Sequence, residues 1–595
     1  METKKIHKYD LGIVGNCSFI ALIDKRAAVK WMCMPRFDSS FLFGGLLDAE
    51  NGGRFEIIPK GNDFDTKQYY IDNTNILCTE FTTALGSFRV IDFAPRFYQY
   101  DRYFKPLMLF RKIEILSGRP VIKVICKPVY NYGKVTPEIA TGSNHIRYLN
   151  FESQVRLTTN ISLNDIVHES EFVLSNNKYM AFSYGAPLEA ALEETSEIFL
   201  QRTKQYWTDW IKTSFIPDFY QKEIIRSVLT LKLHQYEDTG GIIASASTSL
   251  SEFDQSGRNW DYRYCWMRDT YYTLNAFNNI GHFEELEKYF QYIENIISSA
   301  TQRIQPLYSV SGEKIITEQV LDLPGYLNNK PVRIGNDAYT HIQNDVYGQV
   351  MVSLLPVFID KRLNIDEKYK SKSLVIFLLD QIEKTIHEPD AGIWEFRNRK
   401  QFHAYTYLFH WAGGKSGMKI GEYLKDEDIY KRSVNITQQA IIMLEKCYDY
   451  SQSAYTQAVG VPHMDASTLQ LITMNYLNHD SEKTYKHLLA IEKDLCANNG
   501  LIYRYKHNDD FGEPETTFLV CAFWYVEALA CVGRIDDAIE NFEKLIQFSN
   551  HLGLFSEDVS TNGSQWGNFP QTYSHVGLIN AAFRIHKKLD SPLFL

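Results

Sequence analysis

The sequence lacks the basic excess, the paired cysteines and the phosphate-binding loops that mark several large classes of protein. Acidic residues outnumber basic residues by 72 to 62, which gives a formal net charge of -10, so a nucleic-acid-binding surface is not expected. The 9 cysteines are scattered, with no C-x-x-C pair, which argues against a zinc ribbon or a redox dithiol. No P-loop, dinucleotide fingerprint or H-E-x-x-H helix is present. We therefore expect no metal, no cofactor and no nucleic-acid partner.

Long apolar runs are also missing. Residues 1–24 contain one short apolar stretch, interrupted by Asp, Gly and Asn, which fits neither a signal peptide nor a membrane span. Dispersed cysteines in an odd number are typical of free, buried thiols in a reducing compartment. We expect a cytoplasmic protein without a membrane partner, and the sequence leaves its oligomeric state open.

The first part of the sequence is rich in residues that favour β-strands. With 595 residues, the chain is too long for one ordinary core, so two or more domains are expected. Short runs rich in β-branched and aromatic residues recur early, separated by turn signals, and this pattern favours an antiparallel β-sandwich over residues 1–186. The predicted strands are 54–59, 76–82, 88–93, 111–115 and 121–129.

The pattern changes to helix near Pro187. Residues 188–210 carry apolar side chains among Ala, Glu and Gln, which predicts a linker helix within 187–218 that begins near Pro187. From residue 219 to 595 the chain is predicted to be helical to its end. Apolar stripes with helical spacing support this, at 224–231, 346–355, 437–447 and 537–548.

Acidic and aromatic motifs recur through the helical part. They lie about 58 residues apart on average, a length that fits two helices, their turn and one functional loop. Six such hairpins would form a closed (α/α)6 barrel with every motif at one end. The motifs are centred on Asp269, Asp345, Glu395, Asp465, Glu515 and Glu557.

Two of these motifs contain candidate catalytic acids. Glu395 lies in a Pro- and Gly-containing loop between Trp394 and Phe396, where aromatic surface would favour the neutral carboxyl that a general acid needs. The alternative is an exposed loop glutamate. Glu557 and Asp558 are adjacent acids near aromatic residues. One of the two could be a base that activates water, or they could form a helix cap and a solvated neighbour.

A third motif, residues 257–269, concentrates Arg, Asp, Tyr and Trp. Planar groups such as Arg268 and Asp269 suit the paired hydroxyls of a sugar, and the faces of Trp and Tyr suit the apolar face of its ring. A buried ion-pair network that braces two helices is an equally good interpretation of the residues alone.

The ordered set of motifs resembles glycoside hydrolase family 15, the glucoamylase and prokaryotic trehalase family, and the prokaryotic branch is the closest likeness. The resemblance covers nearly the whole chain. Its motifs are Gly15-Asn16, Trp31-Met32-Cys33-Met34-Pro35, residues 258–269, Arg333-Ile334-Gly335-Asn336, Asp345-Val346-Tyr347-Gly348, Gly392-Ile393-Trp394-Glu395, Asp465-Ala466-Ser467, Thr517-Phe518 and Gly567-Asn568-Phe569-Pro570-Gln571.

This resemblance implies a β-sandwich, a linker helix and an (α/α)6 barrel, with Glu395 as general acid and Glu557 as general base. It further implies a set of substrate-binding residues: Tyr262, Trp266, Arg268 and Asp269 around the terminal glucose, Trp394 beside the acid, and Arg504. One departure is Asp558, which stands where the family commonly has a second Glu, so it could share the role of the base.

The function expected from this likeness is an inverting, exo-acting α-glucoside hydrolase of glucoamylase type. It would release β-glucose from the non-reducing ends of α-linked gluco-oligosaccharides. An α,α-trehalase is the main alternative, because the same two acids could cleave trehalose, and isomaltose-type substrates also stay open. The presence of both acids argues against two other classes. An inverting disaccharide phosphorylase needs no base carboxylate, and a non-catalytic sugar-binding protein would be expected to lose one acid.

Overall fold

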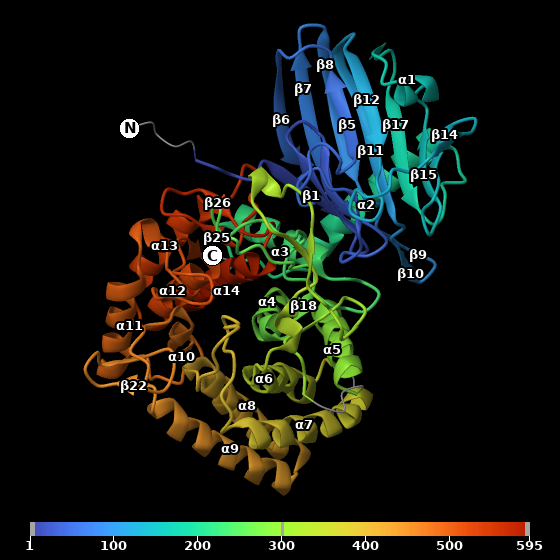
Figure 1. The fold of residues 1–595 in the computed structure, drawn as a ribbon. Coiled ribbons are helices and arrows are strands. Elements are labelled where there is room, and N and C mark those ends of the chain that lie inside the picture. Colours follow the sequence, from blue (N-terminus) through green and yellow to red (C-terminus); the bar gives the residue numbers. More distant parts are fainter. Residues whose placement is uncertain (1–5, 299–302, 364, 590–595) are drawn as a thin grey trace, which may run out of the picture.

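The computed structural model describes residues 6–298, 303–363 and 365–589. Figure 1 shows two parts: a pair of β-sheets, called here the β lobe, and a ring of helices, called the barrel. Among the described residues, no helix is long and apolar enough to cross a membrane.

The β lobe consists of two antiparallel sheets. They share an apolar core: Phe182 of the second sheet lies with its ring centroid 5.3 Å from that of Phe43 in the first. The first sheet contains β1 (Leu11–Gly15), β2 (Ile20–Asp24), β3 (Val29–Cys33), β4 (Phe41–Phe43), β5 (Arg54–Pro59), β12 (Val121–Lys127) and β16 (Phe172–Val173). The second contains, in spatial order, β13 (Ile139–Thr141), β14 (His145–Tyr148), β15 (Val155–Thr159), β17 (Lys178–Tyr184), β11 (Met108–Gly118), β8 (Gly86–Phe93), β7 (Leu77–Thr83) and β6 (Phe64–Tyr70).

The predicted sandwich is confirmed, and the predicted strands correspond to β5, β7, β8, β11 and β12 with ends that differ by at most 3 residues. Smaller elements lie at the edges of the lobe: β9 (Phe97–Gln99), β10 (Arg102–Phe104) and α1 (Leu163–Val167).

Helix α2 (Leu192–Lys212) follows the second sheet. It begins at Leu192, so the prediction of a start near Pro187 is wrong by about one turn. Leu188 and Leu192 both contact the apolar cluster of the second sheet. The chain therefore packs on one face of this sheet before it becomes helical. Further along, the buried Trp210 donates a hydrogen bond from Nε1 to Glu285 Oε1 (2.9 Å), which joins α2 to the barrel.

In the described ranges, α3 to α14 form an inner and an outer ring, as the spacing of the motifs predicts. Neighbouring inner helices contact one another, and α14 contacts α4, which closes the barrel. The inner helices are α4 (Thr270–Ile280), α6 (Asp345–Ile359), α8 (Ala404–Leu424), the single turn α10 (Gln470–Thr473), α12 (Leu519–Cys531) and α14 (Thr572–Leu589). The outer helices are α3 (Gln221–His234), α5 (Phe283–Ser298), α7 (Ile365–Thr385), α9 (Glu427–Glu445), α11 (Glu482–Leu495) and α13 (Ile535–Ile546).

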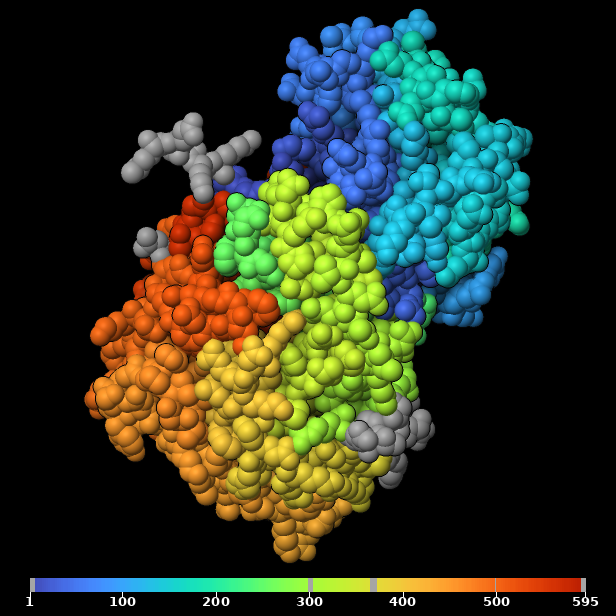
Figure 2. Space-filling model, viewed as in Figure 1, coloured from blue at the N-terminus to red at the C-terminus, as the bar shows by residue number. Residues whose placement is uncertain are grey.

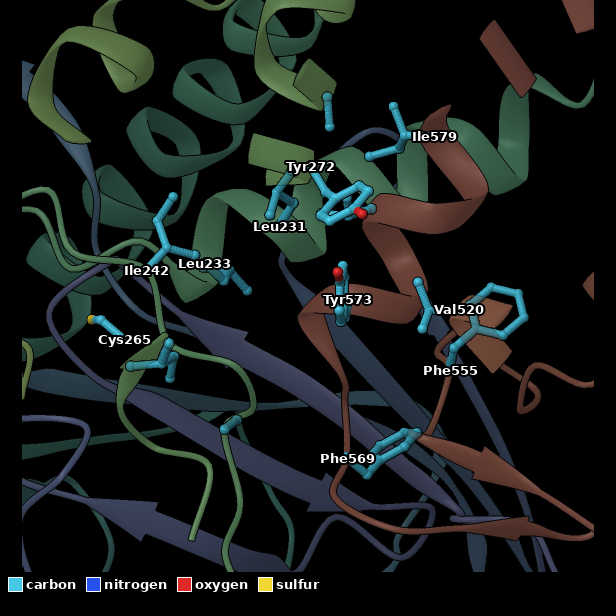
Figure 3. Packing of buried hydrophobic residues seen from close by; sticks show 14 of the residues in the cluster. Leu231, Leu233, Ile242, Cys265, Tyr272, Val520, Phe555, Phe569, Tyr573 and Ile579 are labelled. Carbon is cyan, nitrogen blue, oxygen red and sulfur yellow. The ribbon is translucent and has the colours of Figure 1, made fainter. Parts of the chain in front are cut away.

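Sequence decides which helices are inner. Helix α12 reads LVCAFWYVEALAC, and every one of its residues is buried, whereas α13 buries only Ala538, Phe542 and Leu545. A helix that is apolar all round belongs inside, and one with a single apolar stripe belongs at the surface. Aromatic rings fill the centre of the barrel: Tyr272 of α4 and Tyr573 of α14 have ring centroids 5.3 Å apart (Figure 3).

Helices α6 and α8 approach closely at a pair of glycines. A Cβ on Gly348 would lie 2.1 Å from the carbonyl oxygen of Phe409, and one on Gly413 would lie 2.9 Å from Gly348 Cα. No larger residue fits at Gly348 unless the helices separate, so the inner ring depends on this glycine.

The prediction that the chain is helical from residue 219 to its end is wrong for the loops at one end of the barrel. They hold short antiparallel ladders: β18 (Cys265–Trp266) with β19 (Leu307–Tyr308), β20 (Gln319–Leu321) with β21 (Val332–Ile334), β22 (Tyr448–Asp449) with β23 (Ala454–Tyr455), and β24 (Thr517–Phe518) with β25 (Asp558–Val559) and β26 (Gln565–Trp566). Each predicted acidic motif lies in the segment that leads into an inner helix. Asp269 directly precedes α4 and Asp345 begins α6, where the partial positive charge of the helix end suits an acidic group.

The β lobe supports these loops. Trp31 of β3 donates from Nε1 to the carbonyl of Ala246 (2.8 Å), and the hydroxyl of Tyr9 donates to the carbonyl of Gly567 (2.9 Å). One continuous apolar core extends through both parts. Figure 2 shows the segment after α5 lying across their junction, where the Gly325 N–H donates to Leu47 O (2.9 Å).

Candidate active site

One cavity at the loop end of the barrel, called here the inner compartment, is lined by both predicted catalytic glutamates and by all six predicted substrate-binding residues. These are Tyr262, Trp266, Arg268, Asp269, Trp394, Glu395, Arg504 and Glu557, joined by Ala244, Ile393, Phe518, Gln571 and Tyr573. The structure therefore brings the nominated residues together, and their individual roles stay predictions.

Glu395 is held in a tight loop before α8. Its φ of +60° is unusual for a residue other than glycine, and strain of this kind is concentrated at functional sites. The loop is anchored by the buried carboxylate of Asp390, which accepts hydrogen bonds from the N–H groups of Gly392 (3.1 Å) and Asn344 (2.8 Å). The fold thus fixes the backbone that presents Glu395.

The carboxylate of Glu395 is oriented through one oxygen. Oε1 accepts hydrogen bonds from Trp266 Nε1 (2.6 Å) and Arg268 Nη1 (3.0 Å), so the second oxygen is left for a ligand. The neighbouring Trp394 is fixed by a hydrogen bond from its Nε1 to Asp465 Oδ2 (2.8 Å). These hydrogen bonds therefore hold the rings of Trp266 and Trp394 in fixed orientations beside Glu395.

Glu557 lies just before β25, lines the same cavity as Glu395 and is 1% exposed. Its Oε2 accepts a hydrogen bond from the backbone N–H of Asn568 (3.2 Å). Burial and, next, the negative charge of Glu252 raise the pKa of Glu557 above its ordinary value. A carboxylate with a raised pKa is a stronger base, which suits a group that takes a proton from water.

Asp558, the other candidate for the base, does not line the cavity. It is the first residue of β25, 2% exposed, and its Oδ2 has no hydrogen-bond partner within the described residues. Of the two adjacent acids, only Glu557 lines the cavity.

The Arg- and Asp-rich motif divides between the two interpretations that its residues allow. Arg268 and Asp269, directly before α4, line the cavity, with Arg268 Nε 3.3 Å from Asp269 Oδ1. Burial raises the pKa of Asp269 to about 6, against the opposing charge of Arg268. Arg263 and Asp261 instead form a fully buried pair (2.7 Å), and Arg263 also donates to Ser39 O (2.7 Å) in the β lobe, which is a structural brace.

A second cavity, called the outer compartment, adjoins the first. The two share Tyr262, Trp394, Glu395 and Arg504. The other residues of the outer compartment are mostly charged or aromatic: Glu252, Arg258, Trp260, Asn336, Ala338, His341, Phe396, Arg397, Tyr505, Asp509, Asp510 and Phe511. Glu395 therefore lies on the wall between the inner and outer compartments.

Two contacts shape the outer compartment. The guanidinium of Arg397 lies 4.5 Å from the ring centroid of Trp260. Arg258 forms a bidentate ion pair with Asp509 (2.9 and 2.6 Å), which fixes the loop that carries Phe511. Sequence reasoning did not assign these residues. Trp260 and Arg397 belong to motifs already recognised and could have been found there, but Asp509 carries no local signal.

Three buried carboxyl groups near this wall, of Glu252, Glu557 and Asp558, have oxygens within 4.8 Å of one another, the arrangement that could hold a metal ion. Arg504 already donates to Glu252, and Arg258 lies 4.0 Å from it. The chain therefore supplies positive charge to this cluster itself.

Comparison with known proteins agrees with this architecture. The pattern of "Glycosyl hydrolases family 15" matches residues 218–583, and that of "Trehalase-like, N-terminal" matches residues 2–169. The chain is 30% identical to a trehalase of Thermoplasma volcanium, over 97% of this chain and 93% of that one. It is also 30% identical to a trehalase of Mycolicibacterium smegmatis, over 97% and 91%.

Among solved structures, a bacterial glucoamylase in complex with acarbose is similar, with a TM-score of 0.69 and 16% identity over 99% of this chain and 96% of that one. Identity this low is evidence for the fold alone. The sheet pair, the barrel and the matched family pattern together show that the chain belongs to glycosyl hydrolase family 15 and is a glycoside hydrolase.

Proposed function

We propose that the protein is an inverting α,α-trehalase, the alternative that the sequence leaves open beside a glucoamylase-type enzyme. The observation that carries this proposal is the pair of adjoining compartments with Glu395 on their shared wall. Trehalose is two glucose units joined by one glycosidic oxygen. In the proposed complex one unit occupies each compartment, with the oxygen between them beside Glu395.

The walls of the outer compartment favour one further sugar over a long chain. Its charged groups are held by other groups of the protein, Arg397 on Trp260 and Asp509 on Arg258, so they form a preorganised set of donors and acceptors. A rigid polar wall suits the hydroxyls of one defined unit. The relatives named trehalase match nearly the full length of the chain, which supports the same substrate.

The proposed reaction uses two carboxyl groups. Glu395 donates its proton to the glycosidic oxygen as the C1–O bond breaks, and Glu557 removes a proton from a water that attacks C1 from the opposite face. An oxocarbenium-like transition state forms, and the products are one β-glucose and one α-glucose. Inversion requires room for this water, which in such enzymes means carboxyl groups roughly 6.5–9.5 Å apart.

The test is a panel of trehalose, maltose, maltotriose and isomaltose, followed by proton NMR of the first anomers released. We expect trehalose to be cleaved fastest, with equal amounts of the two anomers at early times. Hydrolysis of maltotriose without that of trehalose would restore the glucoamylase-type reading. Glucose 1-phosphate formed only with added phosphate would identify a phosphorylase. Glu395→Gln and Glu557→Gln serve as inactive controls in every reaction.

A further inference from the structure

Glu252 is a buried carboxylate that no local sequence signal singles out, yet it stands at the wall between the compartments. It is 2% exposed, and its carboxyl oxygens lie within 4.8 Å of those of Glu557 and Asp558. Three carboxyl groups so close together in a buried place cannot all be ionised without strong repulsion. The question is which of them keeps a proton.

The positive charge near this cluster is limited. Arg504 donates to Glu252 Oε2, while Arg258 lies farther away (4.0 Å) and binds Asp509 with both terminal nitrogens. Arg504 is thus the main compensating charge for three carboxyl groups. Within the part of the chain that the structure describes, the other titratable groups that face the cluster are Tyr9, Tyr262, Cys521 and, across the cavity, Glu395. None of these is a cation.

Hydrogen-bond donors distinguish the three carboxyl groups. Glu252 accepts from Arg504 and from Trp260 Nε1 (3.3 Å), and Glu557 accepts from a backbone N–H (3.2 Å). Oδ2 of Asp558 has no partner in the described part of the chain, and Asp558 lines neither compartment, so a ligand cannot reach it. A buried carboxylate oxygen without a donor makes ionisation costlier at Asp558 than at Glu252 or Glu557.

We propose that Glu252 and Asp558 are positioning residues of the hydrolytic site: Asp558 keeps the proton of the cluster, Glu252 binds the arginines, and Glu557 remains the single carboxylate that can accept a proton from water. This inference rests on the proposed function, because it takes Glu557 as the base. Burial, followed by the charges of Glu252 and Glu557, raises the pKa of Asp558 well above its ordinary value. This direction agrees with the missing hydrogen-bond donor at Oδ2 of Asp558.

The location of the proton is tested without turnover, by the infrared C=O stretch of protonated carboxyl groups near neutral pH. We expect Asp558→Asn to lose one such signal relative to the wild-type protein, and Glu557→Gln to keep it. Loss in Glu557→Gln, or no loss in Asp558→Asn, would overturn the assignment. Because this readout needs no substrate, its failure is separate from failure of the trehalase proposal.

The role of Glu252 is tested by the pH profile of kcat/KM, with whichever sugar the substrate panel shows to be cleaved. Removing its charge in Glu252→Gln should ease ionisation of Glu557 and move the acid limb to lower pH by about one unit. KM should rise because Arg504 loses its partner. Glu252→Asp, which keeps the charge, should restore the wild-type limb. Asp558→Asn should lose less than about tenfold in kcat, against roughly a thousandfold for Glu557→Gln.

An acid limb that stays in place in Glu252→Gln would overturn the role of Glu252. Circular dichroism and thermal unfolding of each variant identify any that fails to fold. If Glu252→Gln does not fold, the Glu252→Asp limb decides: it should lie at the wild-type pH, and a shift as large as about one unit would contradict the proposal.

Discussion

Gly567→Ala should displace the proposed base without touching the substrate. Gly567 has φ +72°, and a Cβ added there would lie 2.6 Å from Glu557 Cβ and 2.7 Å from Glu557 Oε2. Real Cβ atoms do not approach other atoms so closely, so the side chain of Glu557 must move. The same residue also accepts the hydroxyl of Tyr9 through its carbonyl, which limits how far the backbone can yield instead.

Two effects of this substitution can be separated. The left-handed backbone costs an alanine about 1 kcal/mol of folding free energy, which thermal unfolding measures. Displacement of a catalytic carboxyl by about 1 Å lowers kcat by about a hundredfold, while KM should change little because the sugar-binding residues are untouched.

Gly563→Ala is the matched control. Gly563 lies in the turn between β25 and β26, whereas Gly567 directly follows β26. Gly563 has φ +88°, but the nearest atom to its added Cβ is Phe548 Cε1, at an ordinary 3.6 Å. It should lose similar stability and keep its kcat. If Gly567→Ala turns over at the wild-type rate, or if both variants lose kcat equally, the contact with Glu557 does not position the base.

Three further outcomes are expected. Glu395→Gln should lower kcat by about a thousandfold with little change in KM, measured by steady-state kinetics; wild-type turnover would exclude it as the acid. Burial raises the pKa of Glu527 to about 7, against the charge of Arg584. Its neutral form therefore stabilises the fold below about pH 4.5, and this contribution is lost as pH rises to about 7. Relative to wild type, the free energy of unfolding of Glu527→Gln, measured by thermal unfolding, should therefore rise by about 3 kcal/mol over that range; parallel curves would contradict this. Gly348→Ala should destabilise by about 2 kcal/mol through its clash with Phe409 O; an unchanged unfolding temperature would contradict the close helix contact.

The sequence predicts the outer parts of the fold better than its centre. Strands and surface helices alternate between apolar and polar residues with a definite period, so β5 and α13 can be recognised locally. Helix α12 is buried on all sides and has no such period; its apolar composition indicates an inner helix but does not show which helices it contacts. The short ladders in the loops are fixed by tertiary contacts that no local pattern contains.

The candidate site shows the same division. Glu395 and Arg268 belong to short segments crowded with aromatic and charged residues, and such segments can be recognised. Local sequence could not separate the cavity-lining pair Arg268 and Asp269 from the structural pair Arg263 and Asp261. Glu252 was missed because its partner Arg504 is 252 residues away, so their relation exists only in the folded chain.

The apolar core that runs without a break from the sheets into the barrel makes the two parts one cooperative unit. A boundary with few contacts allows modules to melt, evolve and be exchanged separately. Here Trp31 and Tyr9 hold the loops that carry the site, so a chimera that replaced the β lobe would inherit a barrel without its supports. Heat should therefore unfold the protein in a single calorimetric transition. A change of substrate preference is better attempted by substitutions in the loop that carries Phe511 than by exchanging the β lobe.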